Sequence, residues 1–336
     1  MKNLLLFVLF ALLLSACGQA EGAGGSPSAA SPAASATGKP LEQVTLAMGY
    51  IPTIQHAPFF VADKKGYFAQ EGLKVDFKWG LEVDGVRLVG ANQIPFALVS
   101  GDQVIQARAQ GIPIVYVANW YNEFPVEVIS LKDKGITKPE DLIGKKVGTP
   151  CLCGASYTAW RALLYSLKID PSKINLQNIG FTQTAALTQG TVDAAIVYAN
   201  NEPVQLGLAG KSIDAIKIWE YAKLVGNGLA TSEQTIQRNP DLVQRFVRAM
   251  VKGIADSINN PAEALQISAA AVPEIGGANL KTSEAVLNAS IPIWKNDRIG
   301  MSRPEDWQAM EQFMLAAGFI QNPVDASKAF TNQFVP

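Results

Sequence analysis

Aromatic and amide side chains gather beside the ends of the predicted strands, and their chemistry suits recognition of a flat ring. Aromatic faces stack on a heterocycle, while amide and carboxyl groups pair with its ring nitrogens and carbonyls and reject analogues that lack them. Core packing is the competing interpretation for each aromatic taken alone, so their accumulation at loop positions carries the prediction. The candidate ligand-binding residues are Tyr50, Gln55, His56, Trp79, Asp102, Asn119, Trp120, Tyr121, Ser156, Tyr157, Phe181, Tyr198, Asn200, Asn201 and Glu202.

The sequence contains no convincing catalytic motif. His56 is the single histidine, and no Gly-x-Ser-x-Gly segment accompanies it to complete a nucleophilic triad. The segment 207–212 faintly resembles a phosphate-binding loop, but its first glycine would fall on Gln205. No carboxylate cluster has the spacing of metal ligands. We therefore expect a binding protein rather than an enzyme, with no cofactor and no metal.

The cysteines at positions 151 and 153 form an isolated Cys-Leu-Cys sequence. They lie too close in sequence to favour an unstrained disulfide. A metal site would need two further soft ligands, and the only other cysteine, Cys17, belongs to the N-terminus. We expect two small, partly buried residues in a turn.

The N-terminus has the pattern of an export signal. Lys2 precedes an apolar run over residues 4–14, which is too short to span a hydrocarbon layer of about 30 Å. The run ends in Leu-Ser-Ala-Cys17, which resembles the bacterial lipobox, so residues 1–17 are predicted to be a lipoprotein signal peptide and Cys17 the acylated residue. An ordinary secretory signal with a chance cysteine is the alternative. Residues 18–42 are rich in Gly, Ala, Ser and Pro and are predicted to form a flexible tether. We expect a body outside the cytoplasm, anchored to the cell membrane.

The charge balance and the length of the chain further restrict the class of protein. Lys plus Arg number 28 and Asp plus Glu 29, a balance without the basic excess that nucleic-acid binding requires. The nearly 300 residues that follow the tether are enough for two domains. Predicted strands and helices alternate along them, which indicates an α/β fold with mainly parallel sheets. We expect a monomer.

Two passages repeat one design about one hundred residues apart. In each, a helix is followed by an apolar strand, at 94–99 and at 192–198, and polar residues follow the strand at once. Ligands bind at that end of the strands in open α/β sheets. Segments 127–132 and 224–231 are expected to cross between two sheets. This predicts lobe I over 43–130 plus 225–336 and lobe II over 131–224, with an amphipathic core helix at 241–258.

The opening of the folded part, Tyr50-Ile-Pro-Thr-Ile-Gln-His-Ala-Pro-Phe-Phe-Val-Ala-Asp-Lys-Lys-Gly-Tyr-Phe-Ala-Gln-Glu-Gly-Leu73, resembles the ABC-transporter solute-binding proteins for sulfonates, nitrate and the thiamine pyrimidine precursor. The segments 144–149, 190–194 and 240–246 fit the same family. The resemblance implies a two-lobed periplasmic-binding-protein (type II) fold with two hinge-crossing strands, which closes on its ligand. It also implies a partner, an ABC transporter permease with its ATPase.

Within this family, segments 178–183 and 197–206 resemble the branch assigned to riboflavin uptake. The pyrimidine-precursor binders usually carry a Trp where this chain has Tyr198 and Asn200. The cleft candidates are poor in cations, since Arg161 lies one helical turn beyond Tyr157, and a neutral ring with hydrogen-bond donors fits better than a sulfonate or nitrate. Residues 154–156 at a predicted helix N-terminus keep the anion class open. A pyrimidine-synthase-like enzyme, as in a eukaryotic branch, is the most distant alternative.

Overall fold

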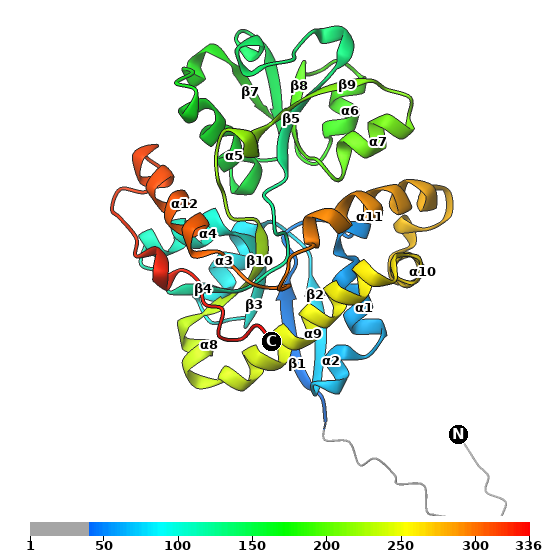
Figure 1. Cartoon of the computed structure of the whole chain (residues 1–336), viewed down its shortest axis with the longest axis vertical. Helices are drawn as coiled ribbons and strands as arrows, with labels where there is room; N and C mark the ends of the chain where they lie inside the picture. The colour runs from blue at the N-terminus through cyan, green and yellow to red at the C-terminus, as the bar shows by residue number, and fades with distance from the viewer. Residues whose placement is uncertain (1–39) are drawn as a thin grey trace, which may run out of the picture. The chain divides into compact units, whose positions relative to one another are not determined.

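Two five-stranded sheets organise residues 40–336, which are the residues that the computed structural model describes. The predicted signal peptide, most of the tether and Cys17 lie outside the described residues. The first sheet has the strand order β2-β1-β3-β10-β4 and contains β1 (Glu42–Ala47), β2 (Leu73–Lys78), β3 (Phe96–Ser100), β4 (Ile114–Asn119) and β10 (Asn227–Ser232). The second has the order β7-β6-β8-β5-β9 and contains β5 (Val126–Leu131), β6 (Lys146–Thr149), β7 (Asn175–Asn178), β8 (Ala194–Tyr198) and β9 (Ile213–Lys217). Figure 1 shows the two sheets in separate lobes, in agreement with the predicted two-lobed α/β fold.

Both sheets have the same topology. In the first, β1 runs parallel to β2 and β3, while β10 is antiparallel to both of its neighbours. In the second, β6 runs parallel to β7 and β8, and β5 takes the antiparallel place.

The chain passes between the sheets at residues 120–125 and returns at 218–226. The first passage comes earlier than expected: Val126–Leu131, which the sequence analysis assigned mainly to lobe I, pairs in the second sheet. The first five residues of this strand are all buried, Glu127 and Ser130 included, so its sequence has no strict apolar and polar alternation that would indicate which sheet it joins.

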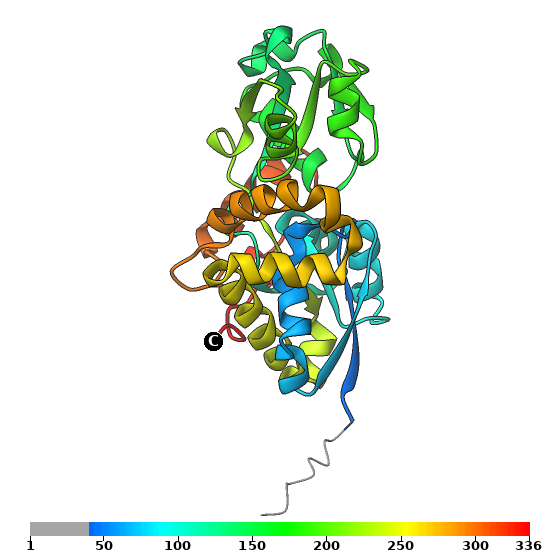
Figure 2. The same ribbon diagram turned by 90° about the vertical axis from the view of Figure 1, so that its right-hand side faces the viewer.

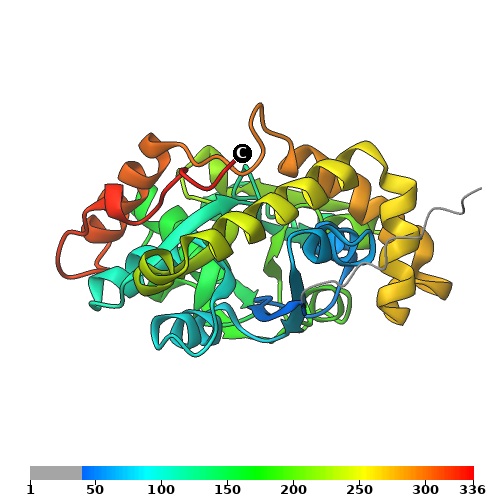
Figure 3. The ribbon, with the colours of Figure 1, turned by 90° about the horizontal axis from the view of Figure 1, so that it is seen from below.

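Helices cover the sheets on both faces (Figure 3). Successive residues of one strand point to opposite faces of the sheet: Leu46 packs in the core with α9, whereas Ala47 packs in the core with α4 and α12. The helices are α1 (Ala57–Lys64), α2 (Tyr67–Gln70), α3 (Glu82–Gly90), α4 (Gly101–Ala109), α5 (Gly154–Ser166), α6 (Gln183–Thr188), α7 (Glu202–Leu208), α8 (Glu233–Arg238), α9 (Pro240–Asn259), α10 (Pro261–Ala271), α11 (Leu280–Trp294) and α12 (Pro304–Ala316).

Helix α9 matches its prediction closely. The Asn239 side chain accepts a hydrogen bond from the backbone nitrogen of Leu242 (3.1 Å), which caps the first turn. Phe246, Met250 and Ile254 of its apolar face are fully buried against the first sheet. No helix among residues 40–336 is both long and apolar enough to cross a membrane.

The lobes pack directly on each other. One apolar cluster continues from α4 in the first lobe to Trp160 and Leu163 of α5 in the second. On another side, Val204 of α7 packs against the main core of the first lobe, near α11. Figure 2 shows α11 at the boundary between the lobes, above α9.

Candidate ligand-binding site

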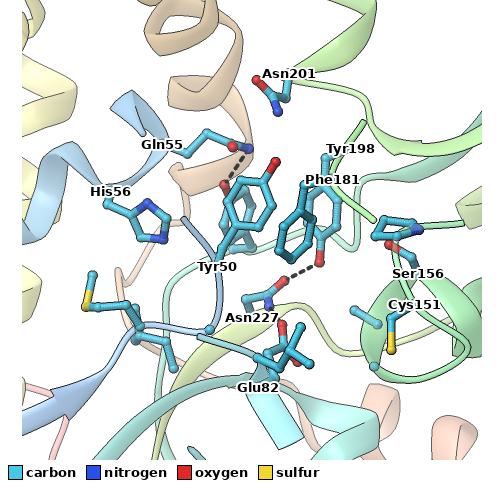
Figure 4. Close-up of a pocket in the computed structure, with 18 of the residues that line it drawn as sticks. Tyr50, Gln55, His56, Glu82, Cys151, Ser156, Phe181, Tyr198, Asn201 and Asn227 are labelled. Atoms are coloured by element: carbon cyan, nitrogen blue, oxygen red, sulfur yellow. Dashed lines mark hydrogen bonds between the residues drawn. The ribbon is translucent and has the colours of Figure 1, made fainter. Parts of the chain in front are cut away.

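A pocket opens between the lobes at the C-terminal ends of the parallel strands, where ligands bind in open α/β sheets (Figure 4). Met48–Tyr50 follow β1, Trp120 follows β4, and residues 150–153 follow β6. The first lobe contributes Met48, Gly49, Tyr50, Gln55, His56, Leu81, Glu82, Val83, Leu98, Trp120, Tyr121 and Asn227, and the second contributes Pro150, Cys151, Cys153, Gly154, Ala155, Ser156, Phe181, Gln183, Tyr198, Asn201 and Glu202.

Aromatic rings from both lobes form the walls of this pocket. Tyr50 of the first lobe meets Phe181 of the second edge to face, with ring centroids 4.7 Å apart. Tyr121 and Tyr198 form a second such pair across the lobes, at 6.1 Å. The indole of Trp120 packs beside Tyr121, at 4.5 Å. Such walls offer flat, rigid surfaces to a ring system.

Glu82, which the sequence analysis missed, places a carboxylate in the lining. It is the first residue of α3, and its Oε2 accepts hydrogen bonds from the backbone nitrogen (3.1 Å) and hydroxyl (2.9 Å) of Ser100. Its Oε1 accepts from Nδ2 of Asn227 at 2.7 Å. Burial, reinforced by the nearby Asp102, raises the pKa of Glu82 to about 7. The carboxylate retains unused acceptor capacity, because each oxygen has two lone pairs.

Glu202 supplies a second carboxylate, from the other lobe. It is the first residue of α7, where Oε2 accepts from the backbone nitrogen of Tyr198 (3.2 Å) and Oε1 from Nδ2 of Asn201 (3.0 Å). Burial raises its pKa to about 7 as well. Donors on a ligand therefore find acceptors in both lobes.

The lining contains no Lys or Arg, and its one histidine, His56, supplies no positive charge either. Burial lowers the pKa of His56 to about 3, so its imidazole is neutral. The one feature that favours negative charge is the start of α5, where Gly154, Ala155 and Ser156 face the pocket. Backbone N–H groups at such a helix start lack partners within the helix and can donate to a ligand oxygen.

Ten of the fifteen predicted site residues line this pocket: Tyr50, Gln55, His56, Trp120, Tyr121, Ser156, Phe181, Tyr198, Asn201 and Glu202. Three further predicted residues lie outside the pocket lining: Trp79, Asn119 and Tyr157. The Trp79 ring packs edge-on against His56 (4.9 Å), Asn119 accepts from the hydroxyl of Tyr116 (2.8 Å), and Tyr157 accepts from Arg161 (3.1 Å).

Asp102 and Asn200, also predicted to hold ligand, instead join the lobes. Asp102 of α4 accepts a hydrogen bond from the hydroxyl of Thr158 in α5 at 2.5 Å. Asn200 donates from Nδ2 to Ser290 of α11 (2.8 Å) and to the hydroxyl of Tyr121 (3.3 Å). Both side chains are buried, and these bonds hold the two lobes together around the pocket.

Cys151 and Cys153 form a disulfide, contrary to the expected pair of turn residues. Their Cα atoms are 5.0 Å apart, within the span that a disulfide bridges, because the backbone between them bends where β6 leads into α5. Both sulfur-bearing residues line the pocket. The short sequence separation argued against a disulfide, because it does not show how sharply the backbone bends between the two cysteines.

The two-sheet topology and the pocket between the lobes define the class of periplasmic solute-binding folds. The periplasmic aliphatic sulphonate binding protein SsuA from Escherichia coli superposes with a TM-score of 0.69 at 14% identity, over 86% of this chain and 97% of that one. At this identity the likeness concerns the fold. A family model described as NMT1/THI5 like matches residues 53–264, and the chain belongs to this family.

Three relatives show the range of the family. The riboflavin-binding protein RibY of Chloroflexus aurantiacus is 38% identical, covering 100% of this chain and 98% of that protein. A formylaminopyrimidine-binding protein of Halalkalibacterium halodurans is 28% identical over 87% of this chain and 90% of its own length. A 4-amino-5-hydroxymethyl-2-methylpyrimidine phosphate synthase of Legionella pneumophila is 26% identical over 88% and 92%.

Proposed function

We propose that this protein is the extracytoplasmic solute-binding component of an ABC importer and that it binds riboflavin between its lobes. The observation that carries the proposal is a pocket with aromatic walls, one carboxylate from each lobe and no Lys or Arg in its lining. Riboflavin offers a flat ring system with an N–H donor and several hydroxyl donors for those acceptors. The 38% identity to a riboflavin-binding relative supports the same ligand.

The geometry ranks the alternatives. A thiamine pyrimidine precursor of the hydroxymethylpyrimidine type is also flat and donates from an amino group, so it is the second candidate, and the pyrimidine-binding relative supports it. Sulfonate and nitrate rank third, because Glu82 and Glu202 disfavour an anion that only the start of α5 would attract. Synthase activity ranks last, and we propose a binding role without catalysis.

The same proposal includes an anchor and a partner. Acylation of Cys17 would hold a monomeric body near the membrane on its tether, where it meets the permease repeatedly. Closure of the lobes on ligand would then distinguish the loaded from the empty protein.

Calorimetry with the purified full-length protein tests the ligand. Riboflavin should bind tightly and lose fluorescence by stacking, hydroxymethylpyrimidine should bind more weakly, and taurine and nitrate should give no heat. Binding of taurine or nitrate without either heterocycle would overturn the ligand assignment. Bound riboflavin should be recovered unchanged by chromatography after long incubation, and its conversion would contradict the non-enzymatic role.

A further inference from the structure

The disulfide between Cys151 and Cys153 occupies an unusual place for a structural crosslink. Both residues line the ligand pocket, and both are only half-buried. Leu152 between them is 54% exposed, so the small ring closed by the disulfide has one side toward the pocket and one toward solvent. Small reagents can therefore approach the sulfur atoms in the folded protein.

We propose that Cys151 and Cys153 form a thiol–disulfide exchange site for small external thiols, and that reduction of this site and binding of ligand oppose each other. The second half rests on the proposed function.

The start of α5 favours release of one thiolate over the other. Cys153 is the N-cap residue of this 13-residue helix, in an extended conformation with φ −153°. A thiolate at that position lies next to backbone N–H groups that lack partners within the helix, at the positive end of the helix dipole. Cys153 is therefore the better leaving group, and Cys151 is the sulfur that an external thiolate attacks.

The exchange needs two equivalents of the external thiol. The first thiolate forms a bond to the sulfur of Cys151, the bond between the two cysteines breaks, and its electron pair goes to the sulfur of Cys153. A second thiolate attacks the external sulfur of this mixed disulfide, which releases the oxidised reagent and leaves Cys151 as a thiolate that takes a proton from water. Two electrons pass from the reagent to the protein.

Reduction changes the pocket in two ways that disfavour ligand. A thiolate at Cys153 adds negative charge to a lining that already holds Glu82 and Glu202 and contains no cation. It also accepts hydrogen bonds from the N–H groups at the start of α5, which are then no longer free to donate to a ligand oxygen. Because coupling between two equilibria is reciprocal, ligand must make the disulfide harder to reduce by the same factor as reduction weakens binding.

The test titrates the full-length protein with dithiothreitol, without ligand and with saturating riboflavin. Alkylation followed by peptide mass spectrometry reports the state of residues 151–153 separately from Cys17. We expect reduction of the folded protein, about a tenfold higher thiol requirement with riboflavin, and a Kd about tenfold larger for the dithiol form. The Cys151→Ser/Cys153→Ser protein serves as the control, because its Kd should not respond to dithiothreitol.

The two single variants test the exchange chemistry without any ligand. The thiol left in Cys151→Ser should react with iodoacetamide at neutral pH faster than the thiol left in Cys153→Ser. A disulfide that resists reduction until urea unfolds the protein, or equal reactivity of the two single thiols, would overturn the exchange site. Equal Kd in the oxidised and dithiol forms would overturn the coupling. Failure of riboflavin to bind the oxidised protein would instead refute the proposed ligand, and the single-variant rates would still decide on the exchange site.

Discussion

The hydroxyl of Tyr198 in the second lobe donates a hydrogen bond to Oδ1 of Asn227 in the first lobe over 2.9 Å. The amide nitrogen of Asn227 donates in turn to Glu82 at 2.7 Å. An aromatic wall of the pocket and a pocket carboxylate are thereby linked by one short chain of hydrogen bonds that runs from one lobe to the other.

Removing the hydroxyl in Tyr198→Phe should weaken riboflavin binding roughly fivefold. The ring remains available for stacking, but the buried acceptor of Asn227 loses its donor, which costs about 1 kcal/mol. Calorimetry measures the effect. Tyr157→Phe is the matched control, because that hydroxyl pairs with Arg161 outside the pocket; a loss as large in the control would speak against a cross-lobe role for Tyr198.

Affinity for a donor-bearing ligand should fall as the pH drops from 8 to 6. The Glu202 carboxylate must be ionised to act purely as an acceptor, and its pKa is raised to about 7. Glu202→Gln should bind more weakly at pH 8 and show a flatter profile, while Glu140→Gln, an exposed glutamate of the same lobe, should follow the unchanged protein. A profile that Glu202→Gln leaves unaltered would assign the pH dependence to another group.

Stability without ligand should change with pH in the opposite direction. A carboxyl whose pKa in the folded protein is about 7, against an ordinary 4.5, binds its proton more tightly when folded. The unfolded chain therefore loses this proton first, and stability falls as the pH rises from about 4.5 through about 7. Thermal unfolding should show a smaller difference in Tm between pH 5 and pH 8 for Glu202→Gln than for the unchanged protein. An equal difference in both proteins would show that Glu202 is not buried in this way.

Asn200→Ala and Ser290→Ala should each weaken binding, and each variant should lose a similar factor in affinity for every ligand. Both substitutions remove the same 2.8 Å hydrogen bond between the lobes, and Asn200 is absent from the pocket lining. The double variant should therefore cost less than the sum of the two single losses. Binding of riboflavin and of shortened flavins to the three proteins checks this, and an Asn200→Ala loss confined to one ligand would indicate direct contact instead.

Cys17→Ala should release the protein from the membrane fraction into the soluble fraction. The predicted acyl chain is attached through the sulfur of Cys17, and residues 18–42 offer no apolar segment to replace it. Mass spectrometry of the membrane-extracted protein should show a lipid adduct on that residue. Retention of Cys17→Ala in the membrane would point to a different means of attachment.

Hydrophobic patterning predicted β3 and β8, which are short apolar runs, and α9, which carries one apolar face at helical spacing. It did not reveal Glu82, because the side chain is charged and opens a helix, where acidic residues usually serve the helix dipole in solvent. Its role follows from Ser100 and Asn227, which are distant in sequence and meet it only in the folded chain.

Asn200 and Asp102 illustrate the reverse case. Each follows a strand, where the sequence analysis placed ligand-binding residues, and each lies within the contact zone of the lobes. Whether such a side chain faces the pocket or the other lobe depends on Ser290 and Thr158, which the chain brings from other elements. The local pattern around a strand end is the same in both situations.

The place of β10 affects the order in which the protein assembles. All strands of the second sheet come from the continuous stretch 126–217, so that lobe has its complete set of strands while the chain is still unfinished. The first sheet cannot join β3 to β4 before residues 227–232 emerge, because β10 lies between them. A nascent chain that ends before β10 therefore carries two additional open strand edges, on β3 and β4, the kind of surface on which chains pair with one another and aggregate. Late insertion of a central strand thus makes the first lobe the slower and more vulnerable half of the molecule during synthesis.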